Sequence, residues 1–122
     1  MYNSIMFTRE YEPLKQYLHE GKVLLIYGPR RVGKTTILQN YLNGTQLKYK
    51  LDTGDNLRTQ HILGSQEFKE ILPYAEGYEL IAIDEAQNIP NIGMALKILV
   101  DQRPDLKIIV TGSSSFELAG QV

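Results

Sequence analysis

The chain has 122 residues, 43% of them hydrophobic and 22% charged, which is enough apolar material for one compact domain. Thirteen basic against fourteen acidic residues give a formal net charge of −1, so neither broad nucleic-acid binding nor binding to an anionic membrane is indicated. The absence of cysteine excludes disulfides and thiolate metal sites and fits a cytoplasmic protein. The longest apolar run, residues 23–27, is too short to span a bilayer, and residues 1–12 lack the pattern of a secretion signal.

The first part of the chain predicts a helix followed by a strand. Tyr11, Leu14 and Leu18 recur at helical spacing, and Gly21 is a natural end for this helix. Residues 22–27 form an apolar, partly β-branched run. Such a run predicts a central strand of a parallel sheet, buried on both faces.

A phosphate-binding loop follows this strand and opens a helix that runs to about Leu42. The loop has a glycine, four further residues and then Gly-Lys-Thr, which is the P-loop pattern. Its glycines allow successive amides to point at one anion, and the first turn of the helix adds its own unpaired amides. Lys34 supplies a charge for the β- and γ-phosphates, in binding and in catalysis, and the Thr35 hydroxyl supplies a ligand for Mg²⁺. The predicted nucleotide-binding residues are Gly28, Pro29, Arg30, Arg31, Val32, Gly33, Lys34, Thr35 and Thr36.

The middle of the chain predicts an edge strand and two short helices. Residues 46–51 alternate between polar and apolar, as in a strand with one solvated face near a sheet edge. Residues 52–63 contain a turn cluster and then a weakly helical segment. Ser65 is expected to cap a second short helix, which Pro73 and Gly77 break.

A pair of carboxylates ends the next apolar run, residues 80–83. The ligand side of a parallel sheet lies at the carboxyl ends of its strands, so Asp84 is placed to hold Mg²⁺ together with Thr35. A second carboxylate beside the metal ligand can orient and deprotonate a water that attacks the γ-phosphate, which predicts Glu85 as the catalytic base. A solvated acidic turn is the alternative interpretation of the pair.

The last part predicts one more helix and one more strand. Residues 92–100 read as an amphipathic helix and residues 107–111 as a strand. Thr111 and Ser113 at its end could place a hydroxyl near the γ-phosphate or the attacking water, although a simple turn or helix cap explains them equally well. Strands thus alternate with helices four times, which predicts parallel βαβ units in a three-layer α/β fold.

Three motifs carry a resemblance to a known family: residues 28–36 (GPRRVGKTT), residues 83–90 (IDEAQNIP) and residues 109–114 (IVTGSS). With their spacing they resemble prokaryotic AAA-type ATPases, whose longer members carry a C-terminal domain of unknown function. The resemblance covers nearly the whole chain. It implies a P-loop NTPase core with five strands in the order 5-1-4-3-2, of which only four are apparent here. We therefore expect residues 1–122 to form an ATPase domain with a mostly parallel sheet, truncated before the fifth core strand and thus incomplete at its C-terminus.

The resemblance also implies roles for individual residues. ATP or ADP and Mg²⁺ are the implied ligands, with Asp84 as the Walker B aspartate and Glu85 as the catalytic glutamate. Thr111 or Ser113 would fill the sensor position. Gln87 belongs to the family-like stretch Asp-Glu-x-Gln-x-x-Pro, but no role follows for it.

Together these patterns predict ATP binding and hydrolysis that drives a conformational change in a partner protein or a C-terminal domain. A nucleotide-gated binding module that hardly hydrolyses ATP is the first alternative. A small-molecule kinase is the second, although no arginine-rich lid or acceptor pocket is visible in the sequence. A GTPase is disfavoured because its guanine-reading tetrapeptide Asn-Lys-x-Asp is absent.

The expected loss of the fifth strand has a consequence for the strand at residues 22–27. In the family's order this strand lies between the fourth and the fifth, so it would form an open and apolar edge. Such an edge tends to recruit another strand, which predicts self-association or marginal stability. Residues 2–8 offer the alternative, because Ile5, Met6 and Phe7 could form a short strand that covers the edge.

Overall fold

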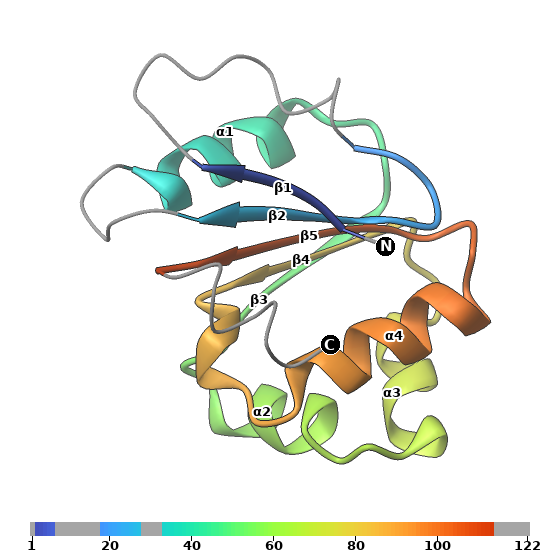
Figure 1. Ribbon diagram of the computed structural model, residues 1–122. Coiled ribbons are helices and arrows are strands. Elements are labelled where there is room, and N and C mark those ends of the chain that lie inside the picture. Colours follow the sequence, from blue (N-terminus) through green and yellow to red (C-terminus); the bar gives the residue numbers. More distant parts are fainter. Residues whose placement is uncertain (1, 7–17, 28–32, 114–122) are drawn as a thin grey trace.

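The computed structural model describes residues 2–6, 18–27 and 33–113 and shows one five-stranded parallel sheet with helices on both faces (Figure 1). The strand order is β1-β2-β5-β4-β3, and every neighbouring pair is parallel. The predicted α/β fold class is therefore confirmed. The elements are, in chain order, β1 (Tyr2–Met6), β2 (Val23–Tyr27), α1 (Lys34–Gly44), β3 (Tyr49–Thr53), α2 (Leu57–Leu63), α3 (Phe68–Ala75), β4 (Leu80–Asp84), the 3-10 turn η3 (Ala86–Asn88), α4 (Ile92–Gln102) and β5 (Lys107–Gly112).

The sheet separates two hydrophobic cores. In Figure 1, α1 lies above the sheet, whereas α2, α3 and α4 lie below it. Strand β2 contributes to both cores: Leu24 and Ile26 pack in the core that contains Leu38 of α1, and Val23 and Leu25 pack in the core on the other side. Each fully buried side chain of this size contributes about 1.5–3 kcal/mol. Burial on both faces explains why β2 reads as a continuous apolar run and not as an alternation.

The N-terminal strand takes the place of the fifth core strand. β1 pairs in parallel with β2, from Tyr2 opposite Val23 to Met6 opposite Tyr27, and β5 pairs with the other edge of β2. The expected open edge on β2 is therefore wrong, and self-association through that edge loses its basis. The physical reason is that an apolar strand with unpaired amides and carbonyls takes the nearest available partner, and residues 2–6 supply one within the same chain.

Removal of residues 1–6 should restore the open edge of β2. We expect the shortened chain to self-associate in a concentration-dependent manner, because an exposed apolar strand templates pairing with another copy. Size-exclusion chromatography with multi-angle light scattering measures this, with the full chain at the same concentrations as the control. A shortened chain that stays folded and monomeric would contradict the assigned role of β1.

Strand β3 forms the opposite edge of the sheet, as predicted, but its alternation does not produce a buried apolar face. Tyr49 and Leu51 are exposed, and the ammonium of Lys50 lies 3.8 Å from the ring centroid of Tyr74 and donates to the Tyr74 carbonyl at 3.2 Å. The strand begins three residues later than predicted, because pairing starts only where Tyr49 lies opposite Leu80 of β4. A lysine on an edge strand also discourages pairing with another chain.

Two expectations for the short helices are wrong. Ser65 does not cap α3; its hydroxyl donates to the Ile62 carbonyl at 2.7 Å and accepts from the Glu67 amide at 3.2 Å, so it joins the end of α2 to the start of α3. A serine hydroxyl competes for local backbone groups in this way. Pro73 does not break α3 but lies inside its last turn. A proline there removes at most one hydrogen bond from a helix that ends at Ala75, two residues before Gly77, whose φ is 85°.

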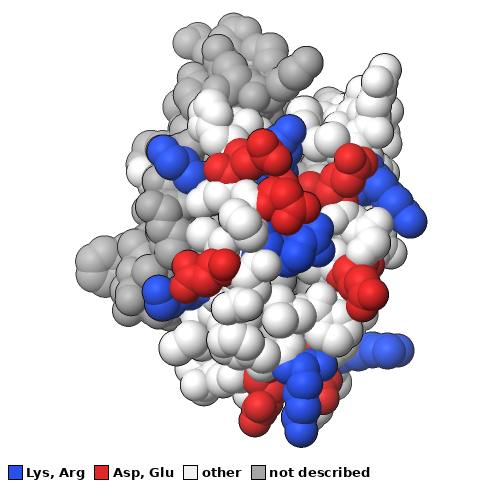
Figure 2. Space-filling model, turned by 90° about the vertical axis from the view of Figure 1, so that its right-hand side faces the viewer, with Lys and Arg blue, Asp and Glu red and all other residues white. Residues whose placement is uncertain are grey.

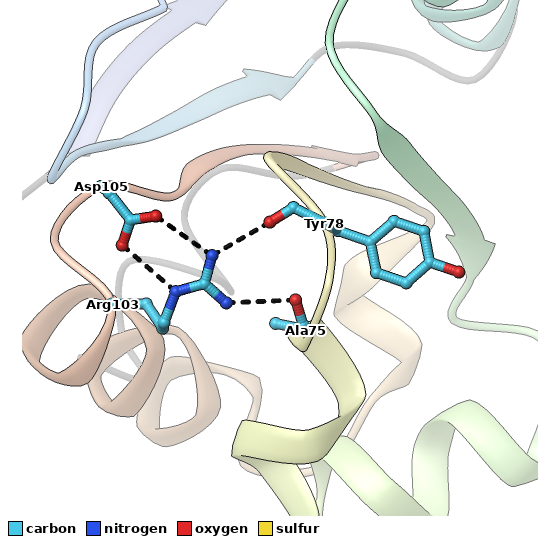
Figure 3. Close-up of polar contacts among 4 residues, drawn as sticks. All are labelled: Ala75, Tyr78, Arg103 and Asp105. Carbon is cyan, nitrogen blue, oxygen red and sulfur yellow. Dashed lines mark hydrogen bonds and ion pairs between the residues drawn. The ribbon is translucent and has the colours of Figure 1, made fainter.

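Arg103 forms several polar contacts near the start of β5 (Figure 3). Its guanidinium donates to the carbonyls of Ala75 and Tyr78, at 3.1 and 3.0 Å, and forms an ion pair with Asp105. The hydrogen bonds from Arg103 lower the pKa of the Asp105 carboxyl. Arg103 thereby satisfies carbonyls at the end of α3 and links α3 to α4.

Figure 2 views the molecule from the end where β5 begins, where Lys and Arg are interspersed with Asp and Glu. None of the described helices is long and apolar enough to cross a membrane.

Candidate functional site

The predicted site residues meet where β4 and β5 end and α1 begins. Gly33 precedes α1 with a φ of 84°, a left-handed conformation that glycine adopts without strain. Lys34, the first residue of α1, is buried, whereas Thr35 and Thr36 are exposed. The remaining predicted nucleotide-binding residues, Gly28, Pro29, Arg30, Arg31 and Val32, lie outside the described residues.

A hydrogen bond joins the start of α1 to the end of β4. The Thr35 hydroxyl donates to Oδ2 of Asp84 at 2.8 Å, across 49 positions of sequence. Neighbouring ligands of an octahedral Mg²⁺ lie about 3 Å apart, given bonds of about 2.1 Å. The two oxygens therefore fit one Mg²⁺ ion. The described residues contain no group of three or more His, Cys, Asp or Glu that could hold a metal. Mg²⁺ in proteins usually keeps several waters and binds substrate phosphates besides one or two carboxylates.

The other oxygen of Asp84 contacts Thr111, which lies at the end of β5 and is completely buried. The Thr111 hydroxyl donates to Oδ1 of Asp84 and accepts from the amide of Glu85 at 3.1 Å. Of the two residues expected at the sensor position, Thr111 is thus the one that contacts Asp84. Ser113 lies two residues further on and is partly exposed. Thr111 fixes the Asp84–Glu85 peptide from the neighbouring strand.

Glu85 has an unusual backbone conformation, with a φ of 52° and a ψ of 45°. Left-handed geometry in a residue with a side chain costs on the order of 1–3 kcal/mol and concentrates at functional sites. The turn after β3 packs against this residue: the Gly54 amide donates to the Asp84 carbonyl at 2.7 Å, and a Cβ on Gly54 would lie 2.1 Å from the Glu85 carbonyl oxygen. The carboxylate of Glu85 accepts from the Gln87 side-chain amide at 2.7 Å.

The AAA domain family model matches residues 20–122. The chain belongs to this AAA family. Two curated relatives, an uncharacterized protein of Mycobacterium bovis and one of Mycobacterium tuberculosis, are each 32% identical to it over 110 residues. The alignment covers 88% of this chain but only 23% of each relative, so the chain spans about a quarter of their length. No solved structure matches the chain.

Family membership confirms the resemblance noted in the sequence and identifies a nucleotide-binding, ATPase-like domain. The strand order agrees with the expected 5-1-4-3-2 core when β2 is counted as the first strand and β1 stands in the fifth position. The match includes Lys34, Thr35, Asp84 and Glu85, whose individual roles stay predictions.

A pocket of about 230 Å³ opens beside the Thr35–Asp84 hydrogen bond of the AAA domain, between α1 and β3. Its other lining residues are Leu38, Gln39, Leu51, Asp52 and Thr53. A larger hollow, of about 480 Å³, lies between β3, α2 and α3 and contains none of the predicted site residues. At its border the Tyr74 hydroxyl donates to Asp52 at 2.7 Å, and burial, with this hydrogen bond, raises the pKa of Tyr74 far above its usual value.

Sequence reasoning missed two contributors to the site. Gly54 was placed in a turn cluster, and nothing in that cluster shows that a neighbouring carbonyl would occupy the place of its Cβ. Gln87 had a motif but no role, and its contact with Glu85 depends on a backbone conformation that the residue types do not encode. The close packing of the loop after β3 against the loop after β4 is the feature that only the structure reveals.

Replacing Thr111 with valine should destabilise the AAA domain. Thr111→Val keeps the shape of the side chain but leaves the Glu85 amide without its acceptor and Oδ1 of Asp84 without the donor from Thr111. Buried groups left unpaired cost about 1–3 kcal/mol in the free energy of unfolding, which urea denaturation measures. Thr111→Ser is the matched control, because it keeps the hydroxyl. A loss in Thr111→Ser with none in Thr111→Val would show that the methyl group, and not the hydrogen bonds, is what matters.

Proposed function

We propose that this AAA domain binds ATP with Mg²⁺ and hydrolyses it, with Glu85 as the general base. The observation that carries the proposal is the hydrogen bond between Thr35 and Asp84. It brings the end of the phosphate-loop motif and the end of an apolar strand within 2.8 Å of each other, at the carboxyl edge of a parallel sheet where such folds bind ligands.

The division of labour follows from the chemistry of each group. The buried Lys34 and the amides at the start of α1 bind the phosphates, and Thr35 and Asp84 would hold Mg²⁺, which neutralises charge on the phosphates when it is bound. Glu85 takes a proton from the attacking water while the water oxygen bonds to the γ-phosphorus. The bond from that phosphorus to the bridging oxygen breaks, and ADP leaves with the bridging oxygen. Thr111 keeps the backbone of Glu85 in place.

Hydrolysis in this proposal drives a conformational change in a partner protein or a neighbouring domain. The support is physical: contacts made by the γ-phosphate disappear on cleavage, and segments held by them are released. The β3–α2 turn is a candidate for such a segment, because Gly54 packs on Glu85 and Asp55 accepts from the Asn88 side-chain amide at 2.6 Å. In the two mycobacterial relatives most of the protein lies outside the matched region.

Replacing Asp84 tests the proposed metal site. Asp84→Asn keeps the size of the side chain but removes the charge that attracts Mg²⁺, so the gain in ATP affinity that Mg²⁺ brings should shrink. Isothermal titration calorimetry in Mg²⁺ and in EDTA measures this gain. Asp101→Asn, at an exposed position on α4, is the matched control. If Mg²⁺ raises the ATP affinity of Asp84→Asn as much as that of the parent, Asp84 does not hold the metal.

A further inference from the structure

We infer that Gln87 is a positioning residue that holds the carboxylate of Glu85 in the orientation needed for hydrolysis. The inference rests on the proposed function of Glu85 as the general base. It assigns a role to a side chain that neither the phosphate-binding motif nor the proposed metal site uses.

The contact between the two side chains requires the unusual backbone at Glu85. Side chains two residues apart do not face each other on a regular helix. Here Glu85 is left-handed, and the 3-10 turn η3 starts directly after it, closed by hydrogen bonds from Asn88 to the Glu85 carbonyl and from Ile89 to the Ala86 carbonyl. This arrangement brings Nε2 of Gln87 to 2.7 Å from Oε2 of Glu85.

The other end of the Gln87 amide shows what this contact costs. Its oxygen, Oε1, is buried and has no hydrogen-bond partner within the described part of the chain. A flipped amide would place that oxygen against the carboxylate of Glu85, so the carboxylate determines which way the amide points. A buried acceptor without a partner is unfavourable, and an apolar side chain of the same length would avoid it. The Gln87 amide therefore donates a hydrogen bond to Glu85, while its own oxygen has no partner among the described residues.

The hydrogen bond from Gln87 orients the side chain of Glu85, which the backbone contacts of Glu85 do not. Thr111 and Gly54 fix the peptide groups of Glu85, but its side chain has further rotatable bonds. Gln87 donates to Oε2 of Glu85, so Oε1 of the Glu85 carboxylate is left to accept the proton of a water. A general base must point at the proton that it removes, so the loss of Gln87 should slow the chemical step and leave ATP binding intact.

Gln87→Met tests this role, because methionine has a similar length and no hydrogen-bonding amide. We expect kcat for ATP hydrolysis to fall about 10- to 100-fold, in line with the cost of misplacing a catalytic group. The KM for ATP should stay within about twofold, since the phosphate-binding groups are untouched. The melting temperature should not fall, since the variant also removes the unpaired Oε1. A merely structural role would lower the melting temperature together with kcat. Gln102→Met, at an exposed position on α4, is the matched control.

A double-mutant cycle identifies Glu85 as the group through which Gln87 acts. In a Glu85→Gln background, Gln87→Met should cause no further loss of kcat; losses that multiply would overturn the inference. The side-chain amide resonances of Gln87 give a second measurement in a chain that retains Gln87: they should shift on Glu85→Ala, and unchanged resonances would overturn it too. If the parent releases phosphate and Gln87→Met does so with the same kcat, the inference alone fails. If the parent releases none, the proposed function fails and the inference falls with it.

Discussion

Glu85→Gln is expected to lower kcat for ATP hydrolysis by about 100- to 10,000-fold, the usual effect of removing a general base. Glutamine keeps the size of the side chain and can still accept the hydrogen bond from Gln87, but it cannot take a proton from water. The Kd for ATP should stay close to that of the parent, because the groups proposed to bind the phosphates and Mg²⁺ are unchanged. Steady-state phosphate release and calorimetry measure the two quantities.

The control for this variant is a glutamate outside the site. Glu76→Gln removes the same charge at an exposed position just after α3 and should leave both quantities unchanged. Hydrolysis by Glu85→Gln at the rate of the parent would show that Glu85 is not the base. Weaker ATP binding in Glu85→Gln would instead point to a role in holding the nucleotide or its metal.

Lys34→Met is expected to weaken ATP binding by about 10- to 150-fold. This range follows from about 1.5–3 kcal/mol for a hydrogen bond between a charged donor and a phosphate. Methionine retains the apolar stem of the lysine, which matters because Lys34 is 97% buried at the first position of α1, with 3% of its surface exposed. Calorimetric titration with ATP and Mg²⁺ measures the change.

A lysine on the surface of α4 provides the comparison for Lys34. Lys97→Met removes an exposed charge that pairs with Asp101 and should leave the ATP affinity as it is. Thermal unfolding of Lys34→Met shows whether the fold has survived. A folded Lys34→Met chain with the ATP affinity of the parent would contradict the assignment of the phosphate loop.

Most of the fold could be predicted because central strands have a strong local signal. β2, β4 and β5 are continuous apolar runs, and the structure places them within a residue or two of the predicted bounds. β1 was only an alternative, because Tyr2–Met6 shows no clear apolar alternation and its partner is about twenty residues away. Pairing between distant segments depends on which edge is left open, and this follows from the whole sheet and not from the segment.

The site was predictable where a motif encodes both the residue type and its place in the fold. The phosphate-loop pattern and the carboxylate at the end of an apolar strand together led to Thr35 and Asp84, which the structure brings into contact. Thr111 is predicted near the γ-phosphate or the attacking water, which stays a prediction; in the structure it contacts Asp84 and the Glu85 amide. The left-handed conformation of Glu85 decides which side chains reach it, and the residue types alone do not reveal that conformation.

The most direct measurement of the proposed function is phosphate release from ATP by the parent chain, in Mg²⁺ and in EDTA. We expect release that is proportional to protein concentration, saturates with ATP and disappears in EDTA, because Thr35 and Asp84 would hold the metal on which the reaction depends. A folded chain that binds ATP but releases no phosphate above the blank would contradict hydrolysis and leave a nucleotide-gated binding module.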